Sequence, residues 1–173
     1  MVAVTSQIDA NSEAFAANRA SMMTFIKRLR SLEARASEAS AKRRATFEKR
    51  GQLLPADRLH RLLDPGMPFL RLHTLANFAV VNPDREASIP GASVMVGIGF
   101  VGGVRCMIWV DDSGIAAGSA TTKTGEVHLS LQEICKRQKL PLIHCVESAG
   151  ANLLQYQTEL WSVFGGVLSL IHI

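Results

Sequence analysis

The sequence predicts a mixed α/β domain preceded by a helical arm, and three observations lead to this prediction. Residues 11–50 contain no Pro or Gly and are rich in Ala, Glu, Lys and Arg, a composition that favours helix. Two apolar runs meet at Gly102-Gly103, as the strands of a β-hairpin do. A helical pattern and a further apolar run follow, so helices alternate with strands only in the second half of the chain.

Length, composition and charge set the outer limits. The chain has 173 residues, which suffice for one ordinary domain, and 47% of them are apolar. The net charge of +4 is modest, but basic residues gather between Ala41 and Arg50. Such a segment suits a phosphate-bearing partner, or it is simply the solvated face of a helix. The modest overall charge gives no reason to expect a nucleic-acid partner.

No apolar stretch approaches the roughly 18 residues that a membrane span requires, and the N-terminus lacks the apolar region of a secretory signal. We therefore expect a soluble, intracellular protein without a membrane partner. Cys106, Cys135 and Cys145 are odd in number and form no C-x-x-C pair, which argues against a disulfide framework or a zinc ribbon. Buried free thiols are the expected outcome.

Residues 1–66 are expected to form the arm and a short second helix. Apolar residues at three- and four-residue spacing give the arm one apolar stripe, which must pack on its own domain or on a partner subunit. The stripe consists of Met22, Phe25, Ile26, Leu29 and Leu32. Gly51 ends the first helix, Pro55 suits the first turn of the next, and Asp64-Pro65-Gly66 stops that one.

Residues 67–167 are expected to form the α/β domain. Residues 68–75 alternate as a strand does, and residues 92–112 contain the two strands of the hairpin. The helix that follows is indicated by the spacing of Val127, Leu131, Ile134 and Cys135. "LIHCV" is the next strand, and another helix is expected from Leu154 to Phe164.

The tail from Leu168 to Ile173 is given no functional weight. Its sequence, "LSLIHI", looks like a translated sequencing adapter fused to an interrupted reading frame. We therefore expect the chain to be a truncated fragment with an artefactual end.

Several familiar motifs occur in the sequence, but the residues around them do not suit the sites that these motifs usually form. Gly97-Ile-Gly99-Phe-Val-Gly102 matches G-x-G-x-x-G, but a strand follows it where a dinucleotide site needs a helix. Asp111-Asp112 lacks a third metal ligand, so turn formation is the better explanation. His144 and Cys145 are neighbours in a strand and face opposite sides, so each is expected in the core. No metal or triad spacing, and no nucleophile elbow, involves the remaining candidates His60, His73, His128 and Ser148.

Two turns rich in Gly, Ala and Ser remain, "GIAAGSATT" at residues 114–122 and "ESAGAN" at residues 147–152. Each follows an apolar strand and precedes a helix. Such turns leave backbone N–H groups free and let a ligand come close, which suits anion binding or stabilisation of an oxyanion. Tight packing of helix on strand would favour the same small residues, so both explanations stay open at this point.

Taken together and in order, several stretches resemble one family, the carboxyltransferase (β) subunits of biotin-dependent acyl-CoA carboxylases in the crotonase-like superfamily. The likeness covers about residues 42–166. The matching stretches are Gly51-Gln-Leu-Leu54 with Arg58, "LLDPGMPFL", "GIGFVGGVRCMIWVDD", "AGSATTKT" and "LPLIHCVESAGANL". The resemblance implies an incomplete crotonase-like β-β-α core behind the helical arm.

The resemblance also implies a reaction, in which a carboxyl group moves from carboxybiotin on a carrier domain to the α or vinylogous carbon of an acyl-CoA. In this family backbone amides, rather than an acid–base pair, hold the thioester enolate oxygen. Those amides fall here on Ala149 and Gly150. Glu147 and Ala149 depart from the family's D-S-G-G-A turn, so the oxyanion hole persists only if the backbone of Ala149 tolerates a Cβ.

For CoA, the resemblance implies contacts from both turns and from the helix that follows the first turn. The implied CoA-binding residues are Ala117, Gly118, Ser119, Lys123, Ala151 and Asn152. The basic segment at Arg43 and Arg44 could also reach the CoA phosphates. Asn152-Leu153 resembles the methylcrotonyl-type branch of the family, which favours a substrate like methylcrotonyl-CoA.

The implied partners are an α subunit with biotin carboxylase and biotin carrier domains, and further copies of the β subunit. The implied location is the bacterial cytoplasm, or the mitochondrial matrix in a eukaryote. The chain alone is expected to be inactive, because the family's second oxyanion hole lies beyond it. Two alternatives are another crotonase-like acyl-CoA enzyme, such as a hydratase or decarboxylase, and a non-catalytic assembly module.

Overall fold

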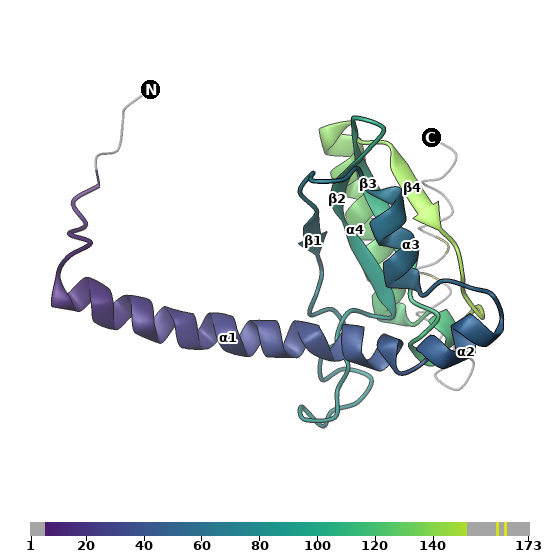
Figure 1. Ribbon diagram of the computed structural model, residues 1–173, viewed down its shortest axis with the longest axis horizontal. Helices are drawn as coiled ribbons and strands as arrows, with labels where there is room; N and C mark the ends of the chain where they lie inside the picture. Colours follow the sequence, from purple (N-terminus) through teal and green to yellow (C-terminus); the bar gives the residue numbers. More distant parts are fainter. Residues whose placement is uncertain (1–5, 152–161, 163–164, 166–173) are drawn as a thin grey trace.

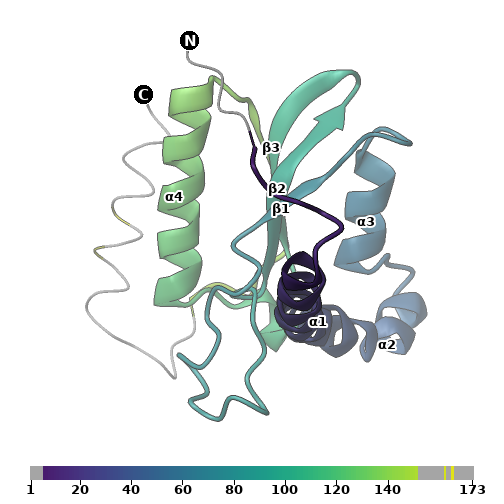
Figure 2. The same ribbon diagram turned by 90° about the vertical axis from the view of Figure 1, so that its left-hand side faces the viewer.

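The computed structural model describes residues 6–151, 162 and 165. A long helix runs out from a small α/β domain, in which α4 covers one face of a β-sheet and α3 covers the other (Figures 1 and 2). The elements in chain order are α1 (Glu13–Ala41), α2 (Arg44–Lys49), α3 (Pro55–Leu62), β1 (Leu70–Leu72), β2 (Val94–Val101), β3 (Val104–Asp111), the 3₁₀ turn η1 (Ala116–Gly118), α4 (Thr122–Gln138) and β4 (Leu142–Cys145).

Helix α1 begins close to the expected position because Ser12 caps it, its hydroxyl accepting a hydrogen bond from the N–H of Phe15 at 3.2 Å. The prediction of one continuous helix as far as Arg50 is wrong, since the chain breaks before α2. Ser40 accounts for the break. It is buried and donates to a carboxylate oxygen of Asp112 at 2.6 Å, which fixes the end of α1 against the domain.

The apolar stripe of α1 is largely exposed. Met22 and Phe25 expose 58% and 64% of their surfaces, and Leu29 is exposed as well. The alternative in which the arm packs along its own domain is therefore wrong for this part of α1. Contacts with the domain come from its C-terminal part, at Arg35 and Ser40. Neither α1 nor any other helix in the described part of the chain is both long and apolar enough to cross a membrane.

The sheet has the strand order β1-β2-β3-β4. Its first two pairings are antiparallel, whereas β3 and β4 are parallel and are connected through α4. The predicted hairpin is confirmed at Gly102 and Gly103, whose positive φ angles of 59° and 78° suit glycine. The Asp64 carboxylate accepts both of their N–H groups, at 2.8 and 2.7 Å. Strand β1 is shorter than the range 68–75 that alternation indicated.

The glycines of the G-x-G-x-x-G stretch have a packing role. A Cβ on Gly97 would overlap the carbonyl oxygen of Leu70 and the ring of Phe69, and a Cβ on Gly99 would overlap Leu63. These glycines therefore let β1 and the segment before it lie directly on β2. Because β3 follows the stretch, the helix that a dinucleotide fingerprint needs does not come after it.

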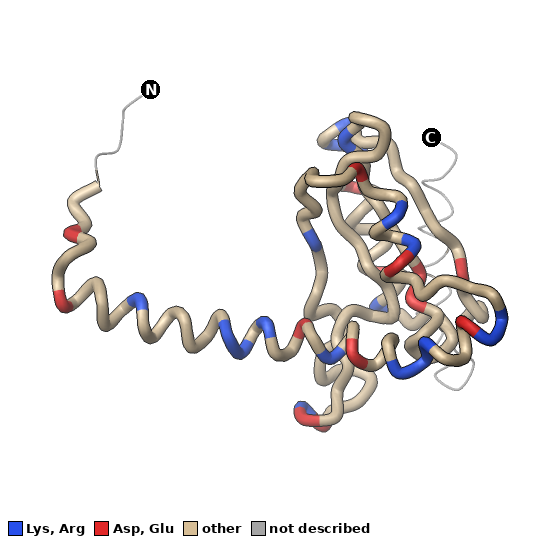
Figure 3. Tube along the Cα trace, in the orientation of Figure 1, with Lys and Arg blue, Asp and Glu red and all other residues tan. Residues whose placement is uncertain are grey.

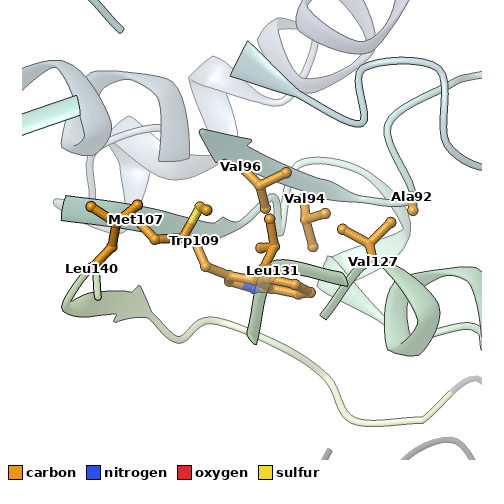
Figure 4. Close-up of a cluster of buried hydrophobic side chains, with 8 residues drawn as sticks. All are labelled: Ala92, Val94, Val96, Met107, Trp109, Val127, Leu131 and Leu140. Atoms are coloured by element: carbon orange, nitrogen blue, oxygen red, sulfur yellow. The ribbon is translucent and has the colours of Figure 1, made fainter. Parts of the chain in front are cut away.

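Both faces of the sheet bury apolar side chains, and β3 serves both because its residues alternate. Met107 and Trp109 belong to the cluster on the α4 face, where Trp109 lies beside Leu131 and Val127, and Met107 lies beside Leu140 (Figure 4). The residues between and beside them on β3 face α3 and pack around Leu59. This second cluster includes Cys106, Ile108 and Val110. The three cysteines are free as predicted, although Cys135 and Cys145 are only half-buried.

Candidate functional site

The two small-residue turns come together at one edge of the sheet. Parallel strands β3 and β4 end on the same side, so the turns that follow them are neighbours. The N–H of Ala149 donates to the carbonyl of Ala117 at 3.0 Å, and the N–H of Ala120 donates to the carbonyl of Gly150 at 2.8 Å. Residues 114–122 and 147–151 thus form one main-chain unit.

The backbone conformation shows where small residues are required. Gly118 has a φ of 67°, and a Cβ there would overlap the carbonyl oxygen of Glu147. Ala116 and Ala117 also have positive φ, 47° and 54°, which costs a residue with a Cβ roughly 1–2 kcal/mol. Tight packing of turn on turn, one of the two explanations for these small residues, is therefore present in the structure.

The backbone of Ala149 tolerates a Cβ, which is the condition for an alanine in place of the family's first glycine. Ala149 is not among the described residues with positive φ, so its backbone accommodates a Cβ. Gly150 does have a positive φ, of 93°, and its flexibility is used. The conformation of the turn at residues 147–151 is thus compatible with alanine in place of the first glycine.

The two N–H groups implied for the oxyanion hole are engaged within this unit. The N–H of Ala149 is bonded to Ala117, and the N–H of Gly150 donates to the hydroxyl of Ser148 at 3.1 Å. That hydroxyl in turn donates to the carbonyl of Gly118 at 2.6 Å. A thioester oxygen that takes these donors must displace the acceptors that hold them here.

A cavity of about 460 Å³ opens against this unit. Its lining joins helix α2 with its two flanking residues and Gln52, the first turn, and the second turn. The lining residues are Arg43, Thr46, Phe47, Arg50, Gln52, Ser113, Gly114, Ala117, Glu147, Ser148 and Ala149. The cavity therefore combines backbone turns with cationic side chains, the two features that an acyl thioester with a phosphorylated carrier requires.

The basic segment divides into residues that face the cavity and residues that do not. Figure 3 shows positive charge concentrated where α1 leads into α2. Arg43 and Arg50 line the cavity, whereas Arg44 pairs with Asp57 at 3.0 Å. The suggestion that Arg44 reaches a ligand is therefore not supported by its position. Arg50 was not singled out from the sequence, although the seven-residue spacing from Arg43 places both on one helical face.

Most of the other residues implied for CoA have partners or positions outside the lining of this cavity. Ser119 lines a second cavity of about 200 Å³, together with Ala116 and Thr121. Lys123 is paired with Glu126 at 2.6 Å in the first turn of α4. Ala151 forms a bridge with Ala120, and Asn152 lies outside the described residues. Among the implied CoA residues within 6–151, Ala117 alone lines the larger cavity.

Two buried carboxylates accept hydrogen bonds from residues of the two turns and of α1, which the sequence did not predict. The turn expected after Asp111-Asp112 is present, since the carbonyl of Asp112 accepts the N–H of Ile115 at 3.0 Å, and both carboxylates are in addition buried, with 6% and 3% exposure. Asp112 accepts the N–H of Gly114 at 3.1 Å in addition to the Ser40 hydroxyl. Burial raises the pKa of Asp112, and the two hydrogen bonds and the charge of Arg58 act against that rise.

One histidine, His144, lies elsewhere than predicted, and a second, His128, packs against a core tryptophan. His144 was expected in the core, but it is exposed on β4, with its Nε2 at 3.3 Å from both carboxylate oxygens of Asp111. His128, on α4, lies against Trp109 with ring centres 4.5 Å apart. Burial lowers the pKa of His128, the charge of His144 lowers it further, and Asp111 raises it.

The fold and the paired turns define a class of protein, the crotonase-like carboxyltransferases. Residues 47–167 match the family model of the carboxyl transferase domain, and the chain belongs to this family. The expectation of a carboxyltransferase fold, made from the sequence motifs, is confirmed.

Within this family, the chain is similar to beta subunits of methylcrotonyl-CoA carboxylases. The chain is 37% identical over 150 residues to the mitochondrial methylcrotonoyl-CoA carboxylase beta chain of Arabidopsis thaliana, covering 84% of this chain and 24% of that one. It is 38% identical over 122 residues to the biotin-dependent 3-methylcrotonyl-coenzyme A carboxylase beta1 subunit of Mycobacterium tuberculosis, covering 70% of this chain and 22% of the other. The chain thus spans about a quarter of the length of these curated relatives.

A solved structure agrees with these relatives. The beta subunit of geranyl-CoA carboxylase from P. aeruginosa superposes with a TM-score of 0.87 and 37% sequence identity. The superposition covers 98% of this chain and 31% of that one.

Proposed function

We propose that this chain is part of the β subunit of a biotin-dependent acyl-CoA carboxylase, which moves a carboxyl group from carboxybiotin to the α or vinylogous carbon of an acyl-CoA. One observation carries the proposal. Two glycine- and alanine-rich turns are joined by main-chain hydrogen bonds at the edge of a cavity whose opposite wall presents Arg43 and Arg50. The family match supports this function over that of a hydratase or a decarboxylase.

The chemistry assigned to this chain is charge stabilisation. Removing a proton next to a thioester, or at the vinylogous position, places negative charge on the thioester oxygen. Fixed backbone donors stabilise that charge better than mobile water does. We assign this role to the N–H groups of Ala149 and Gly150, which exchange their present acceptors for the enolate oxygen. Biotin supplies the carboxyl group from a separate carrier domain, and no residue of this chain holds it covalently.

Arg43 and Arg50 are assigned to the phosphates of CoA. Both lie on the cavity wall formed by α2, across from the turns. Guanidinium groups bind phosphate oxygens through paired N–H donors, so two of them on one helical face suit the diphosphate. Gly118, Ser119, Lys123 and Ala151 remain candidates for contacts with the rest of the carrier, as does Asn152.

The substrate class follows from the relatives' names. Methylcrotonyl-CoA and geranyl-CoA both carry a methyl branch on an unsaturated carbon at the third position of the acyl chain. We propose that the acyl-CoA carboxylated here shares this 3-methyl-2-enoyl group, with methylcrotonyl-CoA as the favoured example.

The partners proposed are a biotin-carrying α subunit and further β subunits. The exposed stripe of α1 supports a role in assembly as well, because it presents apolar side chains to solvent in the described chain. The proposed location is the cytoplasm of a bacterium or the mitochondrial matrix. Since the chain spans about a quarter of its relatives, we expect it to bind CoA without carboxylating methylcrotonyl-CoA.

Isothermal titration of the 173-residue chain with CoA and with pantetheine, which lacks the phosphates, tests the site. We expect Arg43→Ala and Arg50→Ala to weaken CoA binding about tenfold each and to leave pantetheine binding unchanged. Arg44→Ala is the matched control, because Arg44 lies on the same helix but pairs with Asp57. An absence of CoA binding, or an equal loss with Arg44→Ala, would contradict the proposed site.

A further inference from the structure

We propose that Asp111 is a positioning residue for the turn at residues 147–151, whose side chain fixes where the amides of Ala149 and Gly150 lie. This inference rests on the function proposed above. Asp111 makes no contact with the cavity itself. It acts through the N–H of Glu147, the first residue of the turn, which donates to its Oδ2 at 3.0 Å.

Asp111 takes over where the strand pairing stops. The parallel ladder between β3 and β4 ends at Val110 and Cys145. Glu147 lies two residues beyond that pair, outside the ladder. The Asp111 carboxylate provides the acceptor for Glu147 instead. The end of β4 is thus tied to β3 by a side chain rather than by the ladder.

The carboxylate is itself held in place. The indole N–H of Trp109, two residues earlier on the same face of β3, donates to Oδ1 at 2.5 Å. His144, the partner of Trp109 in the ladder, lies with Nε2 at 3.3 Å from both oxygens. A carboxylate that is 6% exposed and has these neighbours has little freedom to change rotamer.

A second anchor of the turn comes from another element. Arg58 on α3 forms an ion pair with the Glu147 side chain. Glu147 is therefore held at two points, its amide by Asp111 and its side chain by Arg58. Two anchors on one residue define the direction in which the following residues, Ser148 to Ala151, leave the sheet. An amide that must meet an enolate oxygen depends on that direction, since misplacement by about 1 Å lowers rates up to 100-fold.

The test compares the binding of an acyl-CoA thioester with the binding of free CoA, which has no acyl group. Titrations of methylcrotonyl-CoA and of free CoA into the 173-residue chain give a ratio of dissociation constants that reports the contacts of the acyl thioester group and cancels those of the carrier. We expect Asp111→Ala to reduce the preference for the thioester about tenfold, while free CoA binds as before. Asp111→Asn keeps one acceptor oxygen and should recover part of the preference. Asp64→Asn is the control, because Asp64 also accepts two turn amides but at the distant hairpin.

The outcomes are distinguishable. Equal weakening of both ligands by Asp111→Ala, or no change in either, would overturn the positioning role and leave the proposed function standing. No binding of either ligand by the unsubstituted chain would overturn both. If the Asp111 variants fail to fold, hydrogen exchange in the unsubstituted chain decides. A Glu147 amide protected to the same degree as the β4 amides supports the anchor, and an amide that exchanges as fast as an exposed turn refutes it.

Discussion

The N–H of Ala149 points at the carbonyl of Ala117, 3.0 Å away, although the two residues belong to different turns. Through this contact each turn completes the hydrogen bonding of the other. The edge of the sheet behaves as one rigid unit in consequence, and changes in either turn are expected to affect both.

Gly118→Ala should destabilise the domain and weaken CoA binding. The φ of 67° is unfavourable for alanine, and the added Cβ would overlap the carbonyl oxygen of Glu147. We expect a loss of about 2 kcal/mol or more in the free energy of unfolding, measured by urea denaturation. Gly102→Ala is the control: its φ is similar, 59°, but its Cβ would meet no atom within 4 Å, so about 1 kcal/mol is expected. Equal losses would show that the close contact between the turns is unimportant.

Ala117→Gly should stabilise the chain. Ala117 has a φ of 54°, which glycine adopts without strain. The relief of strain exceeds the greater entropy of an unfolded chain with glycine, for a net gain of about 0.5–1 kcal/mol. Ala149→Gly is the comparison, since Ala149 is not among the described residues with positive φ, and it should lose about 0.4–1 kcal/mol. Thermal melts of both variants check the opposite signs.

Asp112 should make stability fall as the pH rises. Burial raises its pKa above the ordinary 3.8 in the folded chain. The folded state therefore favours the protonated form, and this stabilisation is complete below pH 3.8 and is lost as the pH rises through the higher folded pKa. Urea denaturation from pH 3 to 7 should show wild type becoming less stable relative to Asp112→Asn. A difference that grows in favour of wild type at higher pH would contradict the assignment.

His128 should have the opposite dependence. Burial, with a smaller contribution from His144, lowers its pKa below 6.5, so the folded state favours the neutral ring. Its contribution to stability is complete above pH 6.5 and is lost as the pH falls through the lower folded pKa. His128→Phe keeps a ring against Trp109 but cannot titrate. The free energy of unfolding of wild type relative to this variant should fall between pH 8 and pH 5.

The stripe on α1 should mediate self-association. Phe25 belongs to this stripe and is 64% exposed. A charge at this position would oppose burial in an interface. We expect Phe25→Glu to raise the dissociation constant of any β-subunit oligomer at least tenfold, measured by light scattering after size exclusion. Lys27→Glu, two residues along and so away from Phe25 on the helix, should leave association nearly unchanged. Equal effects would indicate a general charge effect instead.

Local patterns predicted the elements whose causes are local. The hairpin at Gly102-Gly103, the helix closed before Pro141 and the two small-residue turns all follow from spacing and turn chemistry. The break between α1 and α2 depends on the contact of Ser40 with Asp112, and these residues are 72 positions apart in the sequence. The helix propensities of the residues around the break therefore could not predict it. The length of β1 likewise depends on its partner β2.

The candidate site shows the same division. Gly and Ala at residues 117–118 and 149–150 marked the turns, because close approach of backbones excludes larger side chains. Arg50 could be recognised as a site residue only from the structure, which places α2 across the cavity from the two turns. The engagement of the Ala149 and Gly150 amides, and the burial of Asp111, arise from pairings between distant segments. Such pairings leave no periodic trace in a single sequence.

Ser40 belongs to α1 by its hydrogen bonds and to the domain by its contacts. A Cβ on Gly114, which lines the larger cavity, would overlap the Ser40 hydroxyl. At a rise of about 1.5 Å per residue, the 29 residues of α1 extend roughly 40 Å from that point. The two ends of α1 therefore differ in what they support: removing its first turns would only shorten the arm, whereas removing its last turn would take away the hydroxyl that packs behind Gly114 in the cavity wall.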